Sequence, residues 1–195
     1  MSLPPDAQAV LDFWFGAPGS DTYGRQRKLW FVKRDETDAH IREHFGALTD
    51  SALDGRVPDW GTTPRAALAQ LLLLDQFPRN MHRNTPRAFA GDATALSIAH
   101  DLVSRGGDQT LIPVERIFAY LPFEHSEDIG DQRMALRLFR ALADEHAGFE
   151  STLDYAERHY AVIERFGRFP HRNAILNRIS TPEELSYLAQ PGSGF

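Results

Sequence analysis

Apolar residues recur every three or four positions along most of the chain, which is the spacing of one face of an α-helix. Between residues 35 and 53 these positions are Ile41, Phe45, Leu48, Ala52 and Leu53. Proline, glycine and N-cap residues such as Thr63 mark where such segments begin and end. The pattern predicts helices at about residues 4–15, 35–53, 63–77, 92–105, 113–121, 126–147, 149–166, 174–178 and 182–189.

The central predicted helix, opening at Thr63, is apolar on nearly every side, and a helix of this kind must be covered by other helices. Pro78 is expected to end it, because proline disfavours the helical conformation in the preceding residue. No stretch alternates long enough to predict a sheet, and short loops indicate antiparallel neighbours. We therefore predict an all-α fold of seven to nine antiparallel helices in a single domain over residues 1–195. No convincing copy of the tetratricopeptide (TPR) consensus is found, so any array of helical hairpins is a degenerate one.

Composition excludes several classes of function. The 195 residues carry a net charge of −6 and include no cysteine. A mildly acidic chain without a basic block is unsuited to nucleic acid, and the lack of cysteine removes disulfides and thiolate chemistry. No window is apolar enough for a membrane span, and no leader is recognised. We expect a soluble, cytoplasmic protein with no nucleic-acid or membrane partner; the oligomeric state is not predicted.

Three similar corners carry the candidate chemistry. Each places a proline close to the end of a predicted helix and follows it with polar residues: Phe77–Asn80, Leu121–His125 and Phe169–Asn173. In an up-and-down arrangement alternate helices end on the same side, so the corners are expected to meet on one edge. The residues brought together would be Asp75, Arg79, Asn80, Glu124, His125, Ser126, Glu127, Asp128, Arg165, Arg168, His171, Arg172 and Asn173.

Three interpretations of this cluster stay open. The first is a binding site for a small anion or a peptide carboxylate, with Arg79, Arg168 and Arg172 as anion contacts and Asn80 and Asn173 as orienting donors. The second is a hydrolase with His125 as general base, oriented by Glu127 or Asp128. The third is a structural protein, in which carboxylates and backbone carbonyls saturate the arginines and lock the corners.

Metal and cofactor sites have little support. His40 and His44 are four residues apart on one predicted helix and could share a metal ion, but no third ligand is in view. The chain also contains no P-loop, nucleophile elbow or dinucleotide-binding glycine pattern. We expect neither a metal nor a cofactor.

The corner motifs resemble the bacterial domain-of-unknown-function family 924. The resemblance rests on residues 10–16, 74–80, 121–128 and 165–173, of which the last, RFGRFPHRN, is the most specific. It implies a helical fold similar to the TPR class and implies no established activity. One departure is Asn177, where the family usually has glycine. Asparagine is the next best residue for a left-handed helix end, so the local geometry is expected to survive.

Overall fold

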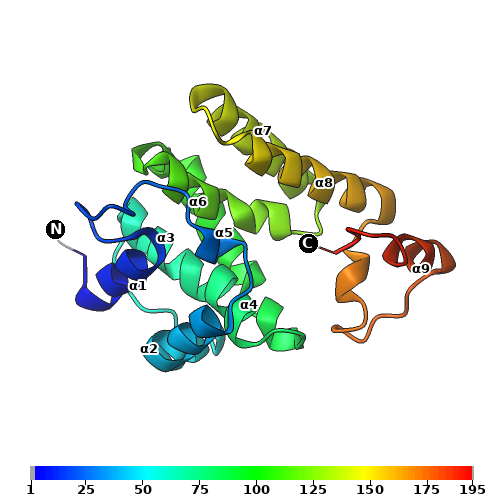
Figure 1. Ribbon diagram of the computed structural model, residues 1–195, viewed down its shortest axis with the longest axis horizontal. Helices are drawn as coiled ribbons and strands as arrows, with labels where there is room; N and C mark the ends of the chain where they lie inside the picture. The colour runs from blue at the N-terminus through cyan, green and yellow to red at the C-terminus, as the bar shows by residue number, and fades with distance from the viewer. Residues whose placement is uncertain (1–2, 195) are drawn as a thin grey trace. The chain divides into compact units, whose positions relative to one another are not determined.

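The structure, a computed structural model, describes residues 3–194, and all regular structure in that range is helical, which confirms the all-α prediction. The helices are α1 (Pro5–Phe15), α2 (Asp35–Leu53), α3 (Pro64–Leu71), α4 (Phe77–Met81), α5 (Asp92–Ser104), α6 (Pro113–His125), α7 (Ile129–Glu145), α8 (Glu150–Phe166) and α9 (Pro182–Leu188) (Figure 1). A π-helical segment, Leu72–Gln76, joins α3 to α4, and short 3-10 helices lie at Lys28–Trp30, Pro86–Phe89, Gly107–Thr110 and Pro170–Arg172. None of the described helices is both long enough and apolar enough to cross a membrane.

The chain forms two compact units. The first runs to Arg83 and resumes over Arg87–Pro122, and the second contains Asn84–Pro86 and the chain from Phe123 onward. The single-domain expectation and the TPR-like hairpin array both stay predictions.

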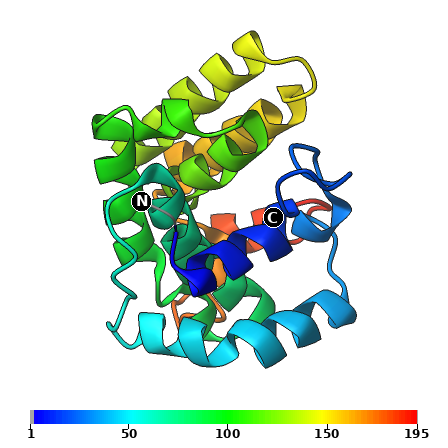
Figure 2. The same cartoon turned by 90° about the vertical axis from the view of Figure 1, so that its left-hand side faces the viewer.

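Aromatic side chains fill the core of the first unit. Trp14 of α1 is fully buried, and its ring centroid lies 5.5 Å from that of Phe77 and 5.6 Å from that of Phe118. Trp30 packs on the same Phe118 ring at 5.0 Å. Helix α3 packs against α1 and α5, and the long helix α2, which Figure 2 shows without a break, packs against α4. Edge-to-face contacts of this kind add to the stabilisation that comes from burial of the rings.

The central helix does not end at Pro78, so that prediction is wrong. The chain widens into the π-helical segment, where the N–H of Phe77 donates to the carbonyl of Leu72, five residues back. Pro78 follows in the first turn of α4, so the N–H that it lacks falls next to this widened turn. The π-helical segment therefore allows the helical backbone to continue past the proline without a break.

Helix α6 also continues past its proline, to His125, whereas the sequence pattern ended it before Pro122. A proline inside a helix removes one backbone hydrogen bond. A separate contact holds the C-terminal end of the helix, where the buried amide of Gln132 donates through Nε2 to the carbonyls of Glu124 at 2.6 Å and Ser126 at 2.7 Å. Sequence periodicity cannot show this contact.

The second unit is built on the antiparallel pair α7 and α8, which lie side by side in Figure 1. Val162 and Ile163 of α8 form a buried cluster with Phe169. Helix α7 begins at Ile129 rather than at Ser126. The helix expected at residues 174–178 is also wrong: those residues form turns, although Asn177 does adopt the predicted left-handed conformation with φ 54°.

Candidate functional site

Arg79, at the first corner, is held by carboxylates within the first unit. Its guanidinium donates to both carboxylate oxygens of Asp92, at 2.8 and 3.1 Å, and to the backbone carbonyl of Asp75 at 2.6 Å. The Asp75 carboxylate lies 3.2 Å away. Burial acts to lower the pKa of Arg79, but the charges of Asp75 and Asp92 raise it above its ordinary value. The fork that was predicted to bind an anion therefore already binds Asp92.

Asn80 lies at the edge of a hollow of about 340 Å³, which we call the α2–α4 hollow. Its lining residues are Lys33, Asp35, Asp38, Arg42, Asn80, Met81 and Arg83. Asp38 is buried and accepts from Asn80 Nδ2 at 2.8 Å and from Arg83 at 2.6 and 2.8 Å. Burial acts to raise the pKa of Asp38, but the hydrogen bonds from Arg83 and Asn80 bring it below the ordinary value.

The second corner begins with two carboxylates that have structural partners. Asp128 is the N-cap of α7 and accepts from the N–H groups of Gly130 and Asp131. Glu127 accepts from both terminal nitrogens of Arg178, at 2.7 and 3.0 Å, and from the N–H of Phe169 at 2.8 Å. Burial acts to raise the pKa of Glu127, and the hydrogen bonds of Arg178 and Phe169 lower it overall. The assignment of either carboxylate as a partner of His125 stays a prediction.

Glu184 of α9 holds the third corner together. It accepts from Arg168 Nε at 2.6 Å and Nη2 at 2.8 Å, from Asn173 Nδ2 at 3.3 Å and from the N–H of Thr181 at 2.7 Å. The hydrogen bonds from Arg168 lead the causes that lower the pKa of Glu184 to about 2. Arg165, by contrast, makes a surface pair with Glu183, with both side chains more than half exposed.

Three histidines gather in the second unit. The ring centroids of His125 and His159 are 6.3 Å apart, and Phe169 lies 5.5 Å from His159 and 5.6 Å from His171. The guanidinium carbon of Arg172 lies 4.6 Å from the centre of the Phe169 ring. The structure thus brings together His125, His171 and Arg172, which the sequence proposed, and adds His159, which it did not.

Burial controls the charge of these rings. His159 Nδ1 lies 2.9 Å from the carbonyl of Tyr155 and 3.1 Å from the buried carboxylate of Glu124. Burial, together with the nearby positive charge of Arg172, lowers the pKa of His159 to about 3 and that of His171 to about 4. Both rings are therefore neutral at pH 7, so His171 would meet an anion as a hydrogen-bond donor rather than as a cation.

The sequence interpretation missed Asp38 and His159. Asp38 falls three residues before Ile41, on the apolar face of α2, so a buried carboxylate on that face was the available signal. His159 stands three residues after Ala156 and four before Ile163 on the buried face of α8, where the periodicity gave the same kind of signal.

The three corners divide between the units. Asp75, Arg79 and Asn80 belong to the first unit, and the residues from Glu124 to Asn173 belong to the second. The expectation that all three corners meet on one edge stays a prediction. Within residues 3–194, no group of three or more acidic or histidine side chains is placed to hold a metal ion together.

The family model described as "Bacterial protein of unknown function (DUF924)" matches residues 10–192. The chain is also similar to a solved structure of a protein of unknown function from Agrobacterium tumefaciens. The two are 39% identical with a TM-score of 0.80, over 94% of this chain and 96% of the other. No curated protein matches the chain.

Proposed function

We propose a function from the geometry of the site, because the chain belongs to the DUF924 family, whose description names no activity. The proposed function is the binding of a small anion, carrying a phosphate or carboxylate group, in the α2–α4 hollow. The proposed ligand is of the class that the corner motifs suggested. In this proposal it binds beside Asn80 rather than on Arg79 or Arg168.

The proposal rests on which arginine and lysine side chains form ion pairs with carboxylates of the protein. Arg79, Arg83 and Arg168 each bind a carboxylate within the protein. In the α2–α4 hollow, neither Lys33 nor Arg42 forms an ion pair with any described carboxylate. The guanidinium of Arg42 makes one long hydrogen bond, from Nη2 to the carbonyl of Met81 at 3.4 Å, which leaves most of its donors for a ligand.

The other charges of the hollow do not cancel this preference. Arg83 neutralises Asp38 through two hydrogen bonds, so the unpaired charges in the lining are Lys33 and Arg42 against the exposed Asp35. The amide of Asn80 keeps a second N–H beyond the one that it gives to Asp38. An anion placed here would receive a charged fork, an ammonium group and an amide donor.

Calorimetric titration with inorganic phosphate tests the proposal. We expect saturable binding with a dissociation constant on the order of 1 mM. Arg42→Gln and Lys33→Gln should each weaken it at least fivefold. Lys28→Gln, outside the hollow, makes the same change of net charge and should leave binding unaltered. Binding that does not saturate, or that Lys28→Gln weakens as much as Arg42→Gln does, would contradict the proposal.

A further inference from the structure

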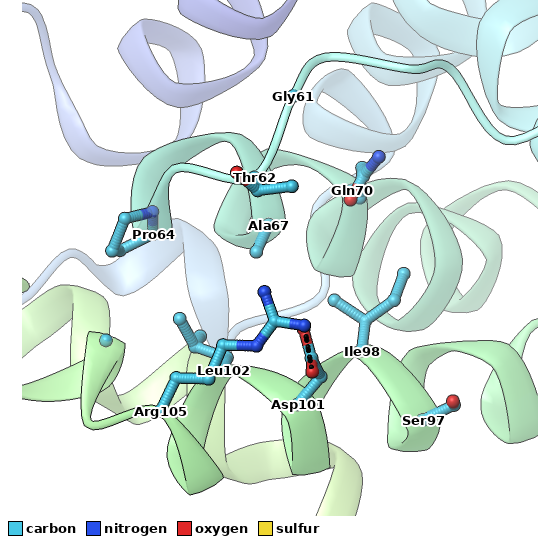
Figure 3. Close-up of a pocket in the computed structure, with 11 residues that line it drawn as sticks. Gly61, Thr62, Pro64, Ala67, Gln70, Ser97, Ile98, Asp101, Leu102 and Arg105 are labelled. Carbon is cyan, nitrogen blue, oxygen red and sulfur yellow. Dashed lines mark ion pairs between the residues drawn. The ribbon is translucent and has the colours of Figure 1, made fainter.

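A second hollow lies in the first unit between α3 and α5 (Figure 3). We call it the α3–α5 hollow. Its volume is about 560 Å³, within the range of small-molecule sites. The lining residues that matter below are Ala67 and Gln70 from α3, and Ile98, Asp101, Leu102 and Arg105 from α5. None of them belongs to the three corners or to the α2–α4 hollow.

One part of this lining is apolar. Ala67 and Ile98 are half-buried and Leu102 is buried, and all three line the space between the two helices. Leu102 and Pro64 approach Gly107 closely, since a Cβ at Gly107 would stand only 2.7 Å from Leu102 Cδ1 and 3.2 Å from Pro64 Cγ. This part of the hollow suits an aliphatic group of a few carbons.

The other part carries one negative and one positive side chain, four residues apart on α5. Arg105 Nη2 lies 2.8 Å from Asp101 Oδ1. In Figure 3 the guanidinium of Arg105 reaches into the space between the helices with Asp101 beside it. No other ion pair of either side chain occurs among residues 3–194, so the remaining donors of Arg105 and the second oxygen of Asp101 are not held by another charged side chain.

The charge pattern selects the ligand. The two charges of the lining cancel, so a ligand with net charge would meet one attractive and one repulsive group. A zwitterion would instead place its cation on Asp101 and its anion on Arg105, exchanging one exposed ion pair for two. An exposed pair at this spacing contributes only about 0.3–0.5 kcal/mol, so little is lost when a ligand separates it.

We propose that the α3–α5 hollow binds an aliphatic zwitterion. The ligand's ammonium group meets Asp101, its carboxylate meets Arg105, and its side chain rests against Ala67, Ile98 and Leu102. A free aliphatic amino acid and a short peptide of such residues share this chemistry. The inference does not depend on anion binding in the α2–α4 hollow.

Calorimetric titration of the full chain with L-leucine, leucyl-leucine, 4-methylpentanoate and isoamylamine tests the proposal. The last two ligands each lack one charge of leucine. We expect at least one zwitterion to bind saturably and both single-charge analogues to bind at least tenfold more weakly. Tighter binding of leucine would identify a free amino acid as the ligand, and tighter binding of the dipeptide would identify a peptide. The absence of binding up to 10 mM, or equal binding of an analogue, would overturn the proposal.

Variants locate the site. Arg105→Gln and Asp101→Asn should each weaken zwitterion binding at least tenfold, and Ala67→Leu should block it by filling the apolar part. The matched controls are Arg158→Gln and Asp154→Asn on α8, which form an ion pair of the same spacing and similar exposure. Circular dichroism should show the four charge variants folded, because both pairs lie on the surface, and it checks the fold of Ala67→Leu. Binding that survives Arg105→Gln, or that the controls reduce equally, would refute the assignment.

Discussion

Replacement of Glu184 by glutamine tests whether the third corner is a structural lock. The Glu184 carboxylate is buried and binds both Arg168 and Asn173, two residues that the sequence marked as ligand contacts. Glutamine keeps the size of the side chain and is accepted at this position of a capping box, so the hydrogen bond from Thr181 N–H can persist. The substitution therefore removes mainly the charge that faces Arg168.

The size of the effect follows from the pKa. The pKa of Glu184 falls from 4.5 to about 2 in the folded protein, and one unit corresponds to about 1.4 kcal/mol, which gives roughly 3.5 kcal/mol as an upper value. The side chain of Arg168 is 29% exposed, so solvent screening reduces it. We expect Glu184→Gln to lower the free energy of unfolding at pH 7 by about 2 kcal/mol.

Urea unfolding followed by circular dichroism measures this loss, with Glu183→Gln as the matched control. Glu183 pairs with Arg165 at the surface, so its substitution should cost less than about 0.5 kcal/mol. Because the folded-state pKa of Glu184 is lowered, its contribution is complete above pH 4.5 and is lost as the pH falls towards 2. The gap between wild type and Glu184→Gln should close over that interval. If Glu184→Gln lowers the free energy of unfolding no more than the control does, Glu184 does not hold Arg168 in place, and the guanidinium of Arg168 is available to a ligand.

Four further substitutions probe other parts of the chain, each by urea unfolding. The lowered pKa of His171 makes its protonation favour the unfolded chain, which costs the wild type up to about 3.5 kcal/mol of stability between pH 6.5 and pH 4. His171→Asn should remove this loss, and an unchanged pH profile would contradict the prediction. Gly91→Ala should cost more than about 3 kcal/mol, since its Cβ would stand 2.2 Å from the carbonyl oxygen of Leu74. Its control, Gly46→Ala, meets only ordinary contacts and should stabilise α2 by about 0.5–1 kcal/mol. Equal effects of the two substitutions would refute the comparison. Asp128→Ala should lower the free energy of unfolding by about 1 kcal/mol, because it removes the N-cap of α7. A change below about 0.3 kcal/mol would show that Asp128 does not stabilise the helix as its N-cap.

Local signals predicted most of the fold. Helix α2 begins and ends where the apolar repeat placed it, and the Thr181–Glu184 capping box starts α9 as its residues indicate. These features depend on residues within one or two turns of each other, which a sequence displays directly. Asn177 is a similar case, because its conformation depends on its own side chain.

Two errors in the fold arose at prolines that the structure keeps inside helices. Pro122 remains inside α6, and the carbonyls at the end of that helix are bound by Gln132 from the next helix. Pro78 is accommodated by a π-helical segment that no periodicity of 3.6 residues reveals. In both places the rule that proline ends a helix was applied to the sequence, but the helix continues through the proline in the structure.

The candidate site was harder to predict because the partners that saturate its arginines are far away in sequence. Arg79 binds Asp92, thirteen positions later, Arg168 binds Glu184, sixteen positions later, and Arg178 binds Glu127, fifty-one positions earlier. Spacing alone cannot distinguish a guanidinium held by such a partner from one held open for a ligand. The sequence could therefore identify the cluster, but it could not show which guanidinium groups already bind a carboxylate of the protein.

The arginines of this protein that pair with a buried carboxylate differ from those that line a hollow without such a partner. Asp75 and Asp38 are buried, and each faces an arginine that the surrounding chain holds in place. A buried carboxylate left without its cation is costly, so an arginine in such a pair is retained for stability whether or not a ligand is present. Among the described residues, Arg42 and Arg105 form no ion pair with a buried carboxylate, and each lines a hollow. Their loss should therefore cost little stability, and any strong effect that it has should appear in binding.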